Sequence, residues 1–384
     1  MRIAVFGGSF DPVHNEHIRV AEKAIQTLGL DKLVVMPANI PPHKKSERLS
    51  FGETRLEMCK RAFAHLEKVE VSNYELEKGG TSYTFETCRY YKAQYPNAQL
   101  FWLVGTDMLR DFPTWKNPQD ILQNVTLAVC ARNEKQGWLT TAQADFKQRF
   151  GVNFVVVEYN GAPVSSTEIR GLAGAGLPVS AYTPPCVAEF IEENSLYKIP
   201  FAQEALALQK PKRREHTIRV ALATARKARA LKIDEEKALT SAFLHDCAKN
   251  LEETHPLLSG FERKAEWGDI PLPVLHQFTG AYIAETAFGI TDTDIVNAVR
   301  YHTSGRENMS ELEKLIFLAD MLEDGRTFEG VEELRARFYA ETDMDDVLKA
   351  CLKRSLEFVK SKGESVYPLT EKAYEFYKGE NYGK

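Results

Sequence analysis

Two histidines three residues apart follow a glycine-containing turn near the start of the chain. The apolar run 3–6 ends at this turn, and the residues that could do chemistry there are Gly7, Gly8, Ser9, Phe10, His14 and His17. Histidines at this spacing lie on one face of a helix. Glycines after a buried strand let phosphates approach the backbone, and a helix start offers free N–H groups. The segment therefore predicts a nucleotide site with two imidazoles beside it.

A second set of ligand-type residues lies in the second half of the chain. It consists of four histidines and two aspartates in apolar, helix-like surroundings: His216, His245, Asp246, His276, His302 and Asp320. A single histidine in such surroundings is usually a core residue, but burying a carboxylate costs several kcal/mol unless a cation compensates its charge. Imidazoles and carboxylates together bind iron, manganese or zinc, and one carboxylate can bridge two ions. The set therefore predicts a metal site.

The elements that must position these residues differ between the two halves. Before residue 200, helical stretches alternate with short apolar runs, as at 32–36, 125–129 and 153–157. This alternation is typical of a parallel sheet with helices on its faces. After residue 200, apolar residues recur every three or four positions, which predicts helices over 215–231, 234–247, 292–301 and 310–322.

The length of the chain, 384 residues, exceeds the usual size of one hydrophobic core. We therefore expect two domains of different class. The first is an α/β Rossmann-like domain with a parallel sheet over residues 1–200, and the second is an all-α domain over residues 211–384. The segment 201–210 is expected to be a linker.

Charge and hydropathy narrow the class of protein. Residues 1–200 hold 22 basic and 22 acidic residues, so the formal net charge of −5 lies in the second half. Without a basic stripe we expect no nucleic-acid partner. The apolar runs are too short for a membrane helix, and the strand-like start leaves no room for a signal peptide, so a cytoplasmic protein is expected. The six scattered cysteines are expected to be reduced packing residues.

Further segments of the first half, together with residues 7–17, resemble a known family. They are 37–44 (PANIPPHK), 73–76 (NYEL), 81–84 (TSYT), 101–107 (FWLVGTD), 113–116 (PTWK) and 164–170 (VSSTEIR). The first seventeen residues resemble the signature of the nucleotidyltransferase superfamily. Taken together, the segments resemble bacterial nicotinate mononucleotide adenylyltransferases over nearly all of residues 1–200.

This resemblance implies that ATP and nicotinate mononucleotide are joined into nicotinate adenine dinucleotide and pyrophosphate, with Mg²⁺ accompanying ATP. It implies catalytic roles for His14, His17, Lys44 and Arg170. The residues it implies in substrate binding are Gly7, Gly8, Ser9, Phe10, Tyr83, Thr84, Gly105, Asp107, Trp115, Arg132, Ser165, Ser166, Thr167 and Ile169. The substrate phosphate would attack the α-phosphorus in line, so positioning and charge neutralisation would carry the catalysis.

Glu16 departs from the family pattern, which commonly has a small residue just before the second histidine. Adjacent residues on a helix point about 100 degrees apart. We therefore expect the Glu16 carboxylate to face solvent rather than the phosphates.

The order of ligand-type residues in the second half is similar to that of the HD superfamily of metal-dependent phosphohydrolases. Four further segments resemble its YqeK-like branch, namely 276–281 (HQFTGA), 300–306 (RYHTSGR), 317–320 (FLAD) and 323–326 (EDGR). The resemblance covers about residues 212–374. That branch hydrolyses diadenosine tetraphosphate symmetrically to two ADP.

This second resemblance implies one or two transition-metal ions, with iron expected. One ion would be held by His216, His245, Asp246 and Asp320, and a second by His276 and His302 with Asp246 shared. Asp246 would thereby be catalytic. The resemblance makes Lys249, Arg306 and Arg326 candidates to bind substrate phosphates.

Three alternatives stay open at this point. The first half could use another phosphate acceptor, such as phosphopantetheine, although the segments around Tyr83 and Trp115 favour a nicotinate ring. The second half could cleave another nucleotide, such as a cyclic dinucleotide or guanosine tetraphosphate, or could be a non-catalytic nucleotide-binding module. The expected partners are ATP, nicotinate mononucleotide and diadenosine tetraphosphate, with no membrane and a homo-oligomer left open.

Overall fold

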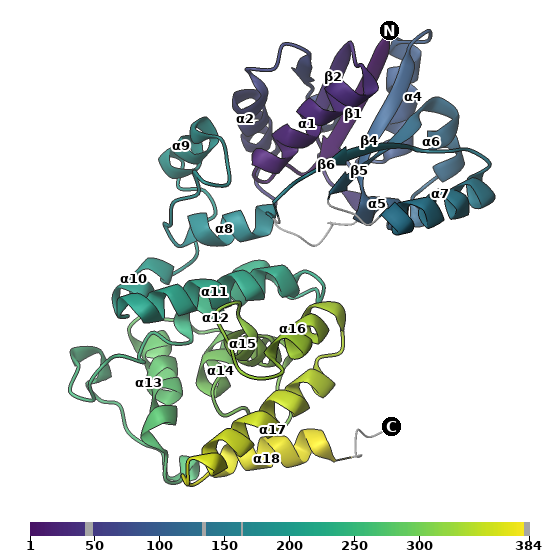
Figure 1. The fold of residues 1–384 in the computed structure, drawn as a ribbon. Coiled ribbons are helices and arrows are strands. Elements are labelled where there is room, and N and C mark those ends of the chain that lie inside the picture. The colour runs from purple at the N-terminus through teal and green to yellow at the C-terminus, as the bar shows by residue number, and fades with distance from the viewer. Residues whose placement is uncertain (43–48, 133–135, 163, 380–384) are drawn as a thin grey trace. The chain divides into compact units, whose positions relative to one another are not determined.

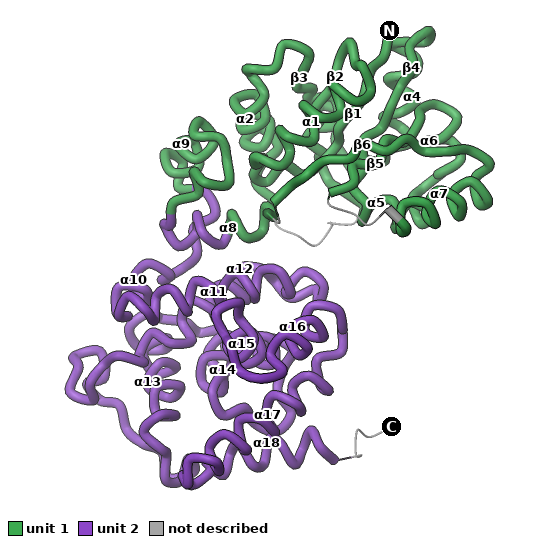
Figure 2. Tube along the Cα trace, viewed as in Figure 1, with its two compact units in different colours: residues 1–170, 178–195 green, residues 171–177, 196–384 purple. Residues whose placement is uncertain are grey.

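The computed structural model describes residues 1–42, 49–132, 136–162 and 164–379. The chain divides into two compact units (Figure 2). Unit 1 comprises residues 1–170 and 178–195, and unit 2 comprises residues 171–177 and 196–384.

Unit 1 is built on one parallel sheet, whose strands are β1 (Arg2–Gly8), β2 (Lys32–Pro37), β3 (Val69–Val71), β4 (Gln99–Gly105), β5 (Thr126–Arg132) and β6 (Val155–Tyr159). The strand order is β3-β2-β1-β4-β5-β6. On the central strand, Val5 pairs with Val34 of β2 on one side and Trp102 of β4 on the other. The direction of winding reverses between β1 and β4, and sheets of this kind bind ligands at the carboxyl ends of the strands beside that reversal.

Helices cover both faces of this sheet (Figure 1). The helices before β6 are α1 (Asn15–Leu28), α2 (Gly52–Phe63), α3 (Tyr74–Lys78), α4 (Thr84–Gln94), α5 (Thr106–Asp111), α6 (Pro118–Asn124) and α7 (Gln136–Phe150), with a 3-10 turn, η2 (Phe112–Thr114). Two further helices follow β6: α8 (Ser166–Gly174), whose last residues belong to unit 2, and α9 (Pro185–Glu193), which packs on α2. On one face Val5 and Trp102 pack with Phe85 of α4 and Phe146 of α7. Because strand residues point alternately to the two faces, a strand covered on both sides is apolar throughout, as β1 and β4 are.

Unit 2 is built from helices. They are α10 (Ala202–Ala207), α11 (Pro211–Ala228), α12 (Glu235–Leu244), α13 (Leu272–Thr286), α14 (Thr293–Tyr301), α15 (Glu311–Leu322), α16 (Val331–Ala340), α17 (Asp345–Ser361) and α18 (Pro368–Lys378), with the 3-10 turns η3 (Pro256–Leu258) and η4 (Ala265–Trp267). Helices α11, α12, α14 and α15 pack on one another around a shared core.

Helix α15 shows how the local sequence produces this packing. A capping box begins it, because the Ser310 hydroxyl accepts a hydrogen bond from the Glu313 backbone N–H at 3.2 Å and the Glu313 carboxylate accepts one from Ser310 N–H at 2.8 Å. Leu312, Leu315 and Ile316 are then fully buried at helical spacing. The apolar face of the helix therefore points into the core and fixes the direction in which its last turn presents Asp320.

The fold class predicted from the sequence is confirmed, with a parallel α/β half followed by a helical half. Strand β3 was not anticipated, because its three residues are only partly buried and lack a long apolar run. The segment expected as a linker contains α10, whose Ala202, Ala205 and Leu206 are buried in the core of unit 2. The exact bounds of the two enzymatic domains remain a prediction.

None of the helices in the described part of the chain combines the length and the apolar character needed to cross a membrane.

Candidate active site and metal centre

The carboxyl ends of β1 and β4 carry glycines that have another side chain close beside them. A Cβ on Gly7 would lie 3.0 Å from the ring of Trp102, and a Cβ on Gly105 would lie 2.5 Å from Oδ1 of Asp107. At Gly7 the contact is with the buried ring of Trp102, whereas at Gly105 it is with the end of the exposed Asp107 side chain, which can turn away. The exposed backbone at these two strand ends is the platform predicted for a nucleotide.

His14 and His17 lie side by side at the start of α1. Their rings are stacked, with centroids 3.6 Å apart and planes inclined by 20°. The backbone N–H of His14 donates a hydrogen bond to Nδ1 of His17 at 3.1 Å. Because a neutral imidazole that accepts at Nδ1 carries its proton on Nε2, His17 is left with Nε2–H as a donor.

Burial keeps both imidazoles uncharged at neutral pH. Burial, together with the nearby Arg132 guanidinium, lowers the pKa of His14 to about 4. Burial and the neighbouring His14 hold the pKa of His17 well below its usual range. The pair can therefore act as neutral hydrogen-bond donors toward phosphate oxygens, rather than as charged groups.

The start of α8 is brought against the turn that precedes His14. Ser166 Oγ donates to the carbonyl of Pro12 at 2.9 Å, and Arg170 donates to the carbonyl of Asp11 at 2.5 Å and to Oγ1 of Thr167 at 3.1 Å. Segments more than 150 residues apart in the sequence therefore meet at one strand end. The predicted closing segment and the two histidines belong to one site.

Other predicted substrate residues have structural contacts of their own. Ser165 caps α8 by accepting from Glu168 N–H at 3.2 Å, and Arg132 donates to the carbonyl of Ala162 at 3.0 Å. Ile169 is buried, and its N–H bonds to the Ser165 carbonyl. The roles of these residues in substrate binding stay predictions.

Residues predicted for the nicotinate side of the site have neighbours of their own. The ammonium of Lys116 lies 4.0 Å from the centre of the Tyr83 ring, and the neighbouring Trp115 packs against Phe112 with ring centres 5.3 Å apart. Thr84 begins α4 immediately after Tyr83. Lys44, predicted to reach the triphosphate, lies outside the described residues.

The expectation that Glu16 faces solvent is wrong. Only 4% of the residue is exposed, and its carboxylate pairs with Arg19. Its Oε2 atom would lie 2.3 Å from a Cβ on Gly161, so the loop after β6 covers it. The side of α1 that carries Glu16 is covered by the loop after β6 instead of being open to water.

Arg55 is a residue of this site that sequence reasoning missed. It is 1% exposed and donates to the carbonyl oxygens of Ser9 at 2.9 Å, Ala38 at 2.6 Å and Ser50 at 2.9 Å. One guanidinium thus joins the loops that leave β1 and β2. In the sequence it looks like any basic residue of an amphipathic helix, so no signal distinguished it.

In unit 2 the carboxylate of Asp246 lies between two pairs of histidines. Its Oδ2 is 3.7 Å from Nε2 of His216 and 3.3 Å from Nε2 of His245. Its Oδ1 is 3.2 Å from Nε2 of His276 and 3.6 Å from Nε2 of His302. A bridging carboxylate of a two-metal site needs this arrangement, with one oxygen for each ion.

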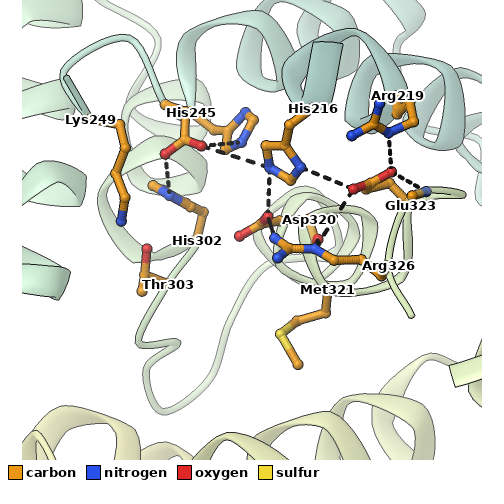
Figure 3. Close-up of polar contacts among 12 residues, drawn as sticks. His216, Arg219, His245, Lys249, His302, Thr303, Asp320, Met321, Glu323 and Arg326 are labelled. Carbon is orange, nitrogen blue, oxygen red and sulfur yellow. Dashed lines mark hydrogen bonds and ion pairs between the residues drawn. The ribbon is translucent and has the colours of Figure 1, made fainter. Parts of the chain in front are cut away.

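Five helices or helix ends supply these side chains. His216 comes from α11, His245 and Asp246 follow α12, His276 comes from α13 and His302 follows α14. Asp320, in the last turn of α15, lies with Oδ1 2.9 Å from Nε2 of His216 (Figure 3). The six residues predicted as ligands are therefore brought together.

The donor set fits divalent metal ions. Two groups of three, His216 with His245 and Asp246, and Asp246 with His276 and His302, each place their ligand atoms within 4.8 Å of one another, and all are buried. The Nε2 atom of His245 is buried and makes no hydrogen bond in the described structure. Such an orphaned nitrogen beside a carboxylate is a ready metal donor.

The electrostatics of the centre agree with this reading. Burial by itself would raise the pKa of Asp246, but the nearby His245, His276 and His302 hold that pKa well below its usual range. Burial lowers the pKa of His276 to about 4. An ionised carboxylate beside a neutral imidazole is the protonation state that metal binding requires.

Two of the three cations predicted to bind phosphate lie at this centre. Lys249 Nζ is 3.0 Å from Nδ1 of His276, and Arg326 pairs with Asp320 at 2.5 Å. Arg306 instead makes a bidentate contact with the buried Glu313, with its Nη2 atom 2.9 Å from Oε1. Arg213, which was not predicted, pairs with Oδ2 of Asp246 at 2.8 Å.

The buried state of His14 makes the stability of unit 1 depend on pH. Its pKa is about 4 in the folded chain against an ordinary value of 6.5, so the unfolded chain binds the proton first as the pH falls. Stability is therefore lost between pH 6.5 and 4. We expect His14 alone to lower the free energy of unfolding by about 2 kcal/mol between pH 7 and 5.

Urea unfolding followed by tryptophan fluorescence would measure this effect, because Trp102, Trp115 and Trp138 all lie in unit 1. His14→Gln should flatten the pH dependence, whereas the exposed His65→Gln should leave it unchanged. A His14→Gln profile that coincides with that of the unaltered chain would contradict the assignment.

Comparisons with known proteins match two different families to the first and second halves of the chain. The sequence profile of the cytidylyltransferase-like family matches residues 5–172, and that of the HD domain matches residues 213–325. A Mycoplasma genitalium protein named a probable nicotinate-nucleotide adenylyltransferase/Ap4A hydrolase is 30% identical over 326 residues, which are 85% of this chain and 88% of that protein.

Other relatives match one half each. A probable nicotinate-nucleotide adenylyltransferase of Clostridium perfringens is 35% identical over 198 residues, which are 51% of this chain and 98% of the relative. A Clostridium acetobutylicum structure described as a predicted HD superfamily hydrolase involved in NAD metabolism is 33% identical, covers 46% of this chain and 95% of its own, and has a TM-score of 0.42. Because the similarity to the Mycoplasma protein spans both halves, the chain belongs to the family of nicotinate-nucleotide adenylyltransferases joined to an HD-domain Ap4A hydrolase.

Proposed function

We propose that the chain is a bifunctional enzyme. Unit 1 transfers the adenylyl group of ATP to nicotinate mononucleotide, giving nicotinate adenine dinucleotide and pyrophosphate. Unit 2 hydrolyses diadenosine tetraphosphate symmetrically to two ADP. Two observations support the proposal. The six ligand-type residues of unit 2 meet at one buried carboxylate, and in unit 1 the start of α8 contacts the turn that precedes His14.

In unit 1 the reaction needs no covalent intermediate. The phosphate of nicotinate mononucleotide attacks the α-phosphorus of ATP in line, and pyrophosphate leaves with the electron pair of the broken bond. His17 donates its Nε2–H to an oxygen that gains negative charge, with His14 stacked against it at 3.6 Å. Arg170 and Lys44 add positive charge, and Mg²⁺ accompanies the triphosphate of ATP.

In unit 2 the His216, His245, Asp246 and Asp320 side chains would hold one cation, and Asp246, His276 and His302 would hold a second. When bound, the ions would activate water and stabilise the charge on attacking and leaving oxygens. Two histidines and one carboxylate form the ligand set of iron(II) sites, so we propose iron. Lys249 and Arg326 lie beside the ligands and would bind the polyphosphate.

His17→Ala tests the adenylyltransferase site. Loss of one donor to developing charge should lower kcat by about a hundredfold or more. Steady-state assay of pyrophosphate release would measure it, with the exposed His65→Ala as the matched control in the same unit. If His17→Ala lowers the melting temperature but leaves kcat intact, the histidine pair is structural.

The choice of mononucleotide tests the substrate of that site. A site built around the carboxylate of the nicotinate ring should reject the amide, which lacks the charge, so kcat/KM for nicotinate mononucleotide should exceed that for nicotinamide mononucleotide. Both substrates are compared in the same assay, with phosphopantetheine as the acceptor of a rival reaction. Equal rates with acid and amide would refute the assignment.

Asp246→Ala tests the metal centre. Removing the shared carboxylate should abolish binding of both ions and hydrolysis of diadenosine tetraphosphate, whereas His276→Ala should remove mainly the second ion. Metal analysis of the purified full chain and chromatography of the nucleotide products would measure these outcomes. The exposed Asp269→Ala is the matched control.

Both metal-centre variants should keep the adenylyltransferase activity of unit 1, which reports that unit 1 is folded, and circular dichroism checks the helices of unit 2. Full metal content and full hydrolysis in Asp246→Ala would show that unit 2 is not an HD hydrolase.

A further inference from the structure

The histidines of the metal centre differ in what lies behind them. In each ring Nε2 is the nitrogen near Asp246, and Nδ1 has a partner of its own. Nδ1 of His245 lies 2.6 Å from the Ala242 carbonyl, and Nδ1 of His302 lies 2.7 Å from the Val299 carbonyl. Both partners are neutral backbone groups within the same turn, so they orient the rings without adding charge.

His216 has a carboxylate behind it instead. Its Nδ1 lies 3.1 Å from Oε1 of Glu323, which is 1% exposed (Figure 3). The other oxygen of Glu323 accepts from Arg219 Nε at 2.6 Å and from the backbone N–H of Gly325 at 2.5 Å. Because both oxygens are engaged, the carboxylate is fixed. It holds the proton of His216 on Nδ1 and leaves Nε2 free to bind a cation.

His276 has a cation beside it. The ammonium of Lys249 lies 3.0 Å from Nδ1 and 3.3 Å from Nε2 of this ring. The same ammonium donates to the Pro273 carbonyl at 3.1 Å, which anchors it. A positive charge at this distance opposes a second positive charge bound to the ring.

The direct donors are also unequal. The His216 half of the centre consists of His216, His245, Asp246 and Asp320, and the His276 half consists of Asp246, His276 and His302. Two arginines oppose a cation in the His216 half, because Arg213 pairs with Asp246 and Arg326 with Asp320. Their side chains are 29% and 37% exposed, so their charged ends can turn to solvent or to a substrate phosphate.

We propose that the two halves of the metal centre are loaded in order, with the His216 half binding a divalent cation first and more tightly. Glu323 is the positioning residue that strengthens the His216 half, and Lys249 weakens the His276 half. This inference rests on the proposed metal-dependent hydrolase function of unit 2. Glu323 would raise the metal affinity of the His216 half through its contact with His216, without binding the metal itself.

Calorimetric titration of the chelator-stripped full chain with Mn²⁺ tests the order of loading. We expect two classes of site, with the tighter class lost in His216→Ala and the weaker class lost in His276→Ala. The reverse assignment, or two equal affinities, would overturn the inference while leaving the hydrolase proposal intact. No Mn²⁺ binding in the unaltered chain would instead refute the metal-dependent function itself.

Substitution of Glu323 tests the cause. Glu323→Gln should weaken the tighter class by about 10- to 100-fold, the usual effect of losing a partner behind a metal-bound histidine. Glu323→Asp should recover part of that loss. Glu313→Gln is the matched control, because Glu313 is an equally buried carboxylate of unit 2 that contacts Arg306 rather than a metal ligand.

Lys249→Met provides an independent test that does not disturb the buried carboxylates. It should tighten the weaker class by about tenfold, although it removes a predicted phosphate contact and so should not improve hydrolysis. Circular dichroism checks the folding of every variant. Unchanged Mn²⁺ affinities in folded Glu323→Gln and Lys249→Met would refute the proposal.

Discussion

The helical unit depends on the compensation of one buried carboxylate. Asp246 is 2% exposed, and an ionised carboxylate at that depth is strongly disfavoured unless cations or hydrogen-bond donors surround it. The structure surrounds it with four imidazole nitrogens and the Arg213 guanidinium. These partners lie on or directly after α11, α12, α13 and α14, so the packing of these helices places the compensating groups around the carboxylate. The need to compensate buried negative charge also explains why Arg213 pairs with Asp246 and Arg326 pairs with Asp320. A bound metal ion would supply that positive charge directly.

The sheet unit meets a different requirement, which is to keep two strand ends open for the proposed phosphates. Glycine at 7 and 105 keeps the strand ends clear, because Trp102 and Asp107 fill the space beside them. The buried Arg55 guanidinium donates hydrogen bonds to carbonyl oxygens of the loops after β1 and β2, and so connects these loops. The two histidines are kept neutral by burial, so they can donate hydrogen bonds to phosphate without requiring an acidic pH. One chain therefore contains a site built on neutral donors and a site built on compensated charges.

Neighbours of the functional residues set their chemistry as much as the residues themselves do. His216 and His276 are the same side chain in comparable burial, yet a carboxylate lies behind one and an ammonium beside the other. Glu16 shows the same point in unit 1, because the loop after β6 covers a carboxylate that a helical projection alone places toward water. Arg306 and Arg326 are both predicted phosphate ligands, but Arg306 pairs with Glu313 away from the metal ligands, whereas Arg326 pairs with the ligand Asp320. Such pairings depend on which helices become neighbours.

The sequence by itself determined the class of each half, the strands around β1, β2, β4, β5 and β6, and the two constellations of histidines and aspartates. These follow from apolar periodicity and from residue types at short spacing, which are local properties of the chain. It did not reveal β3, α10, Arg55, the contact of Glu323 with His216 or the burial of Glu16. Each of these depends on contacts between segments far apart in sequence: Glu323 lies 107 residues from His216, and Arg55 lies 46 residues from Ser9. Only the tertiary structure decided that Glu323 lies beside His216 and Lys249 beside His276, because the packing of the helices, and not the local spacing of residues, sets the distances between these side chains.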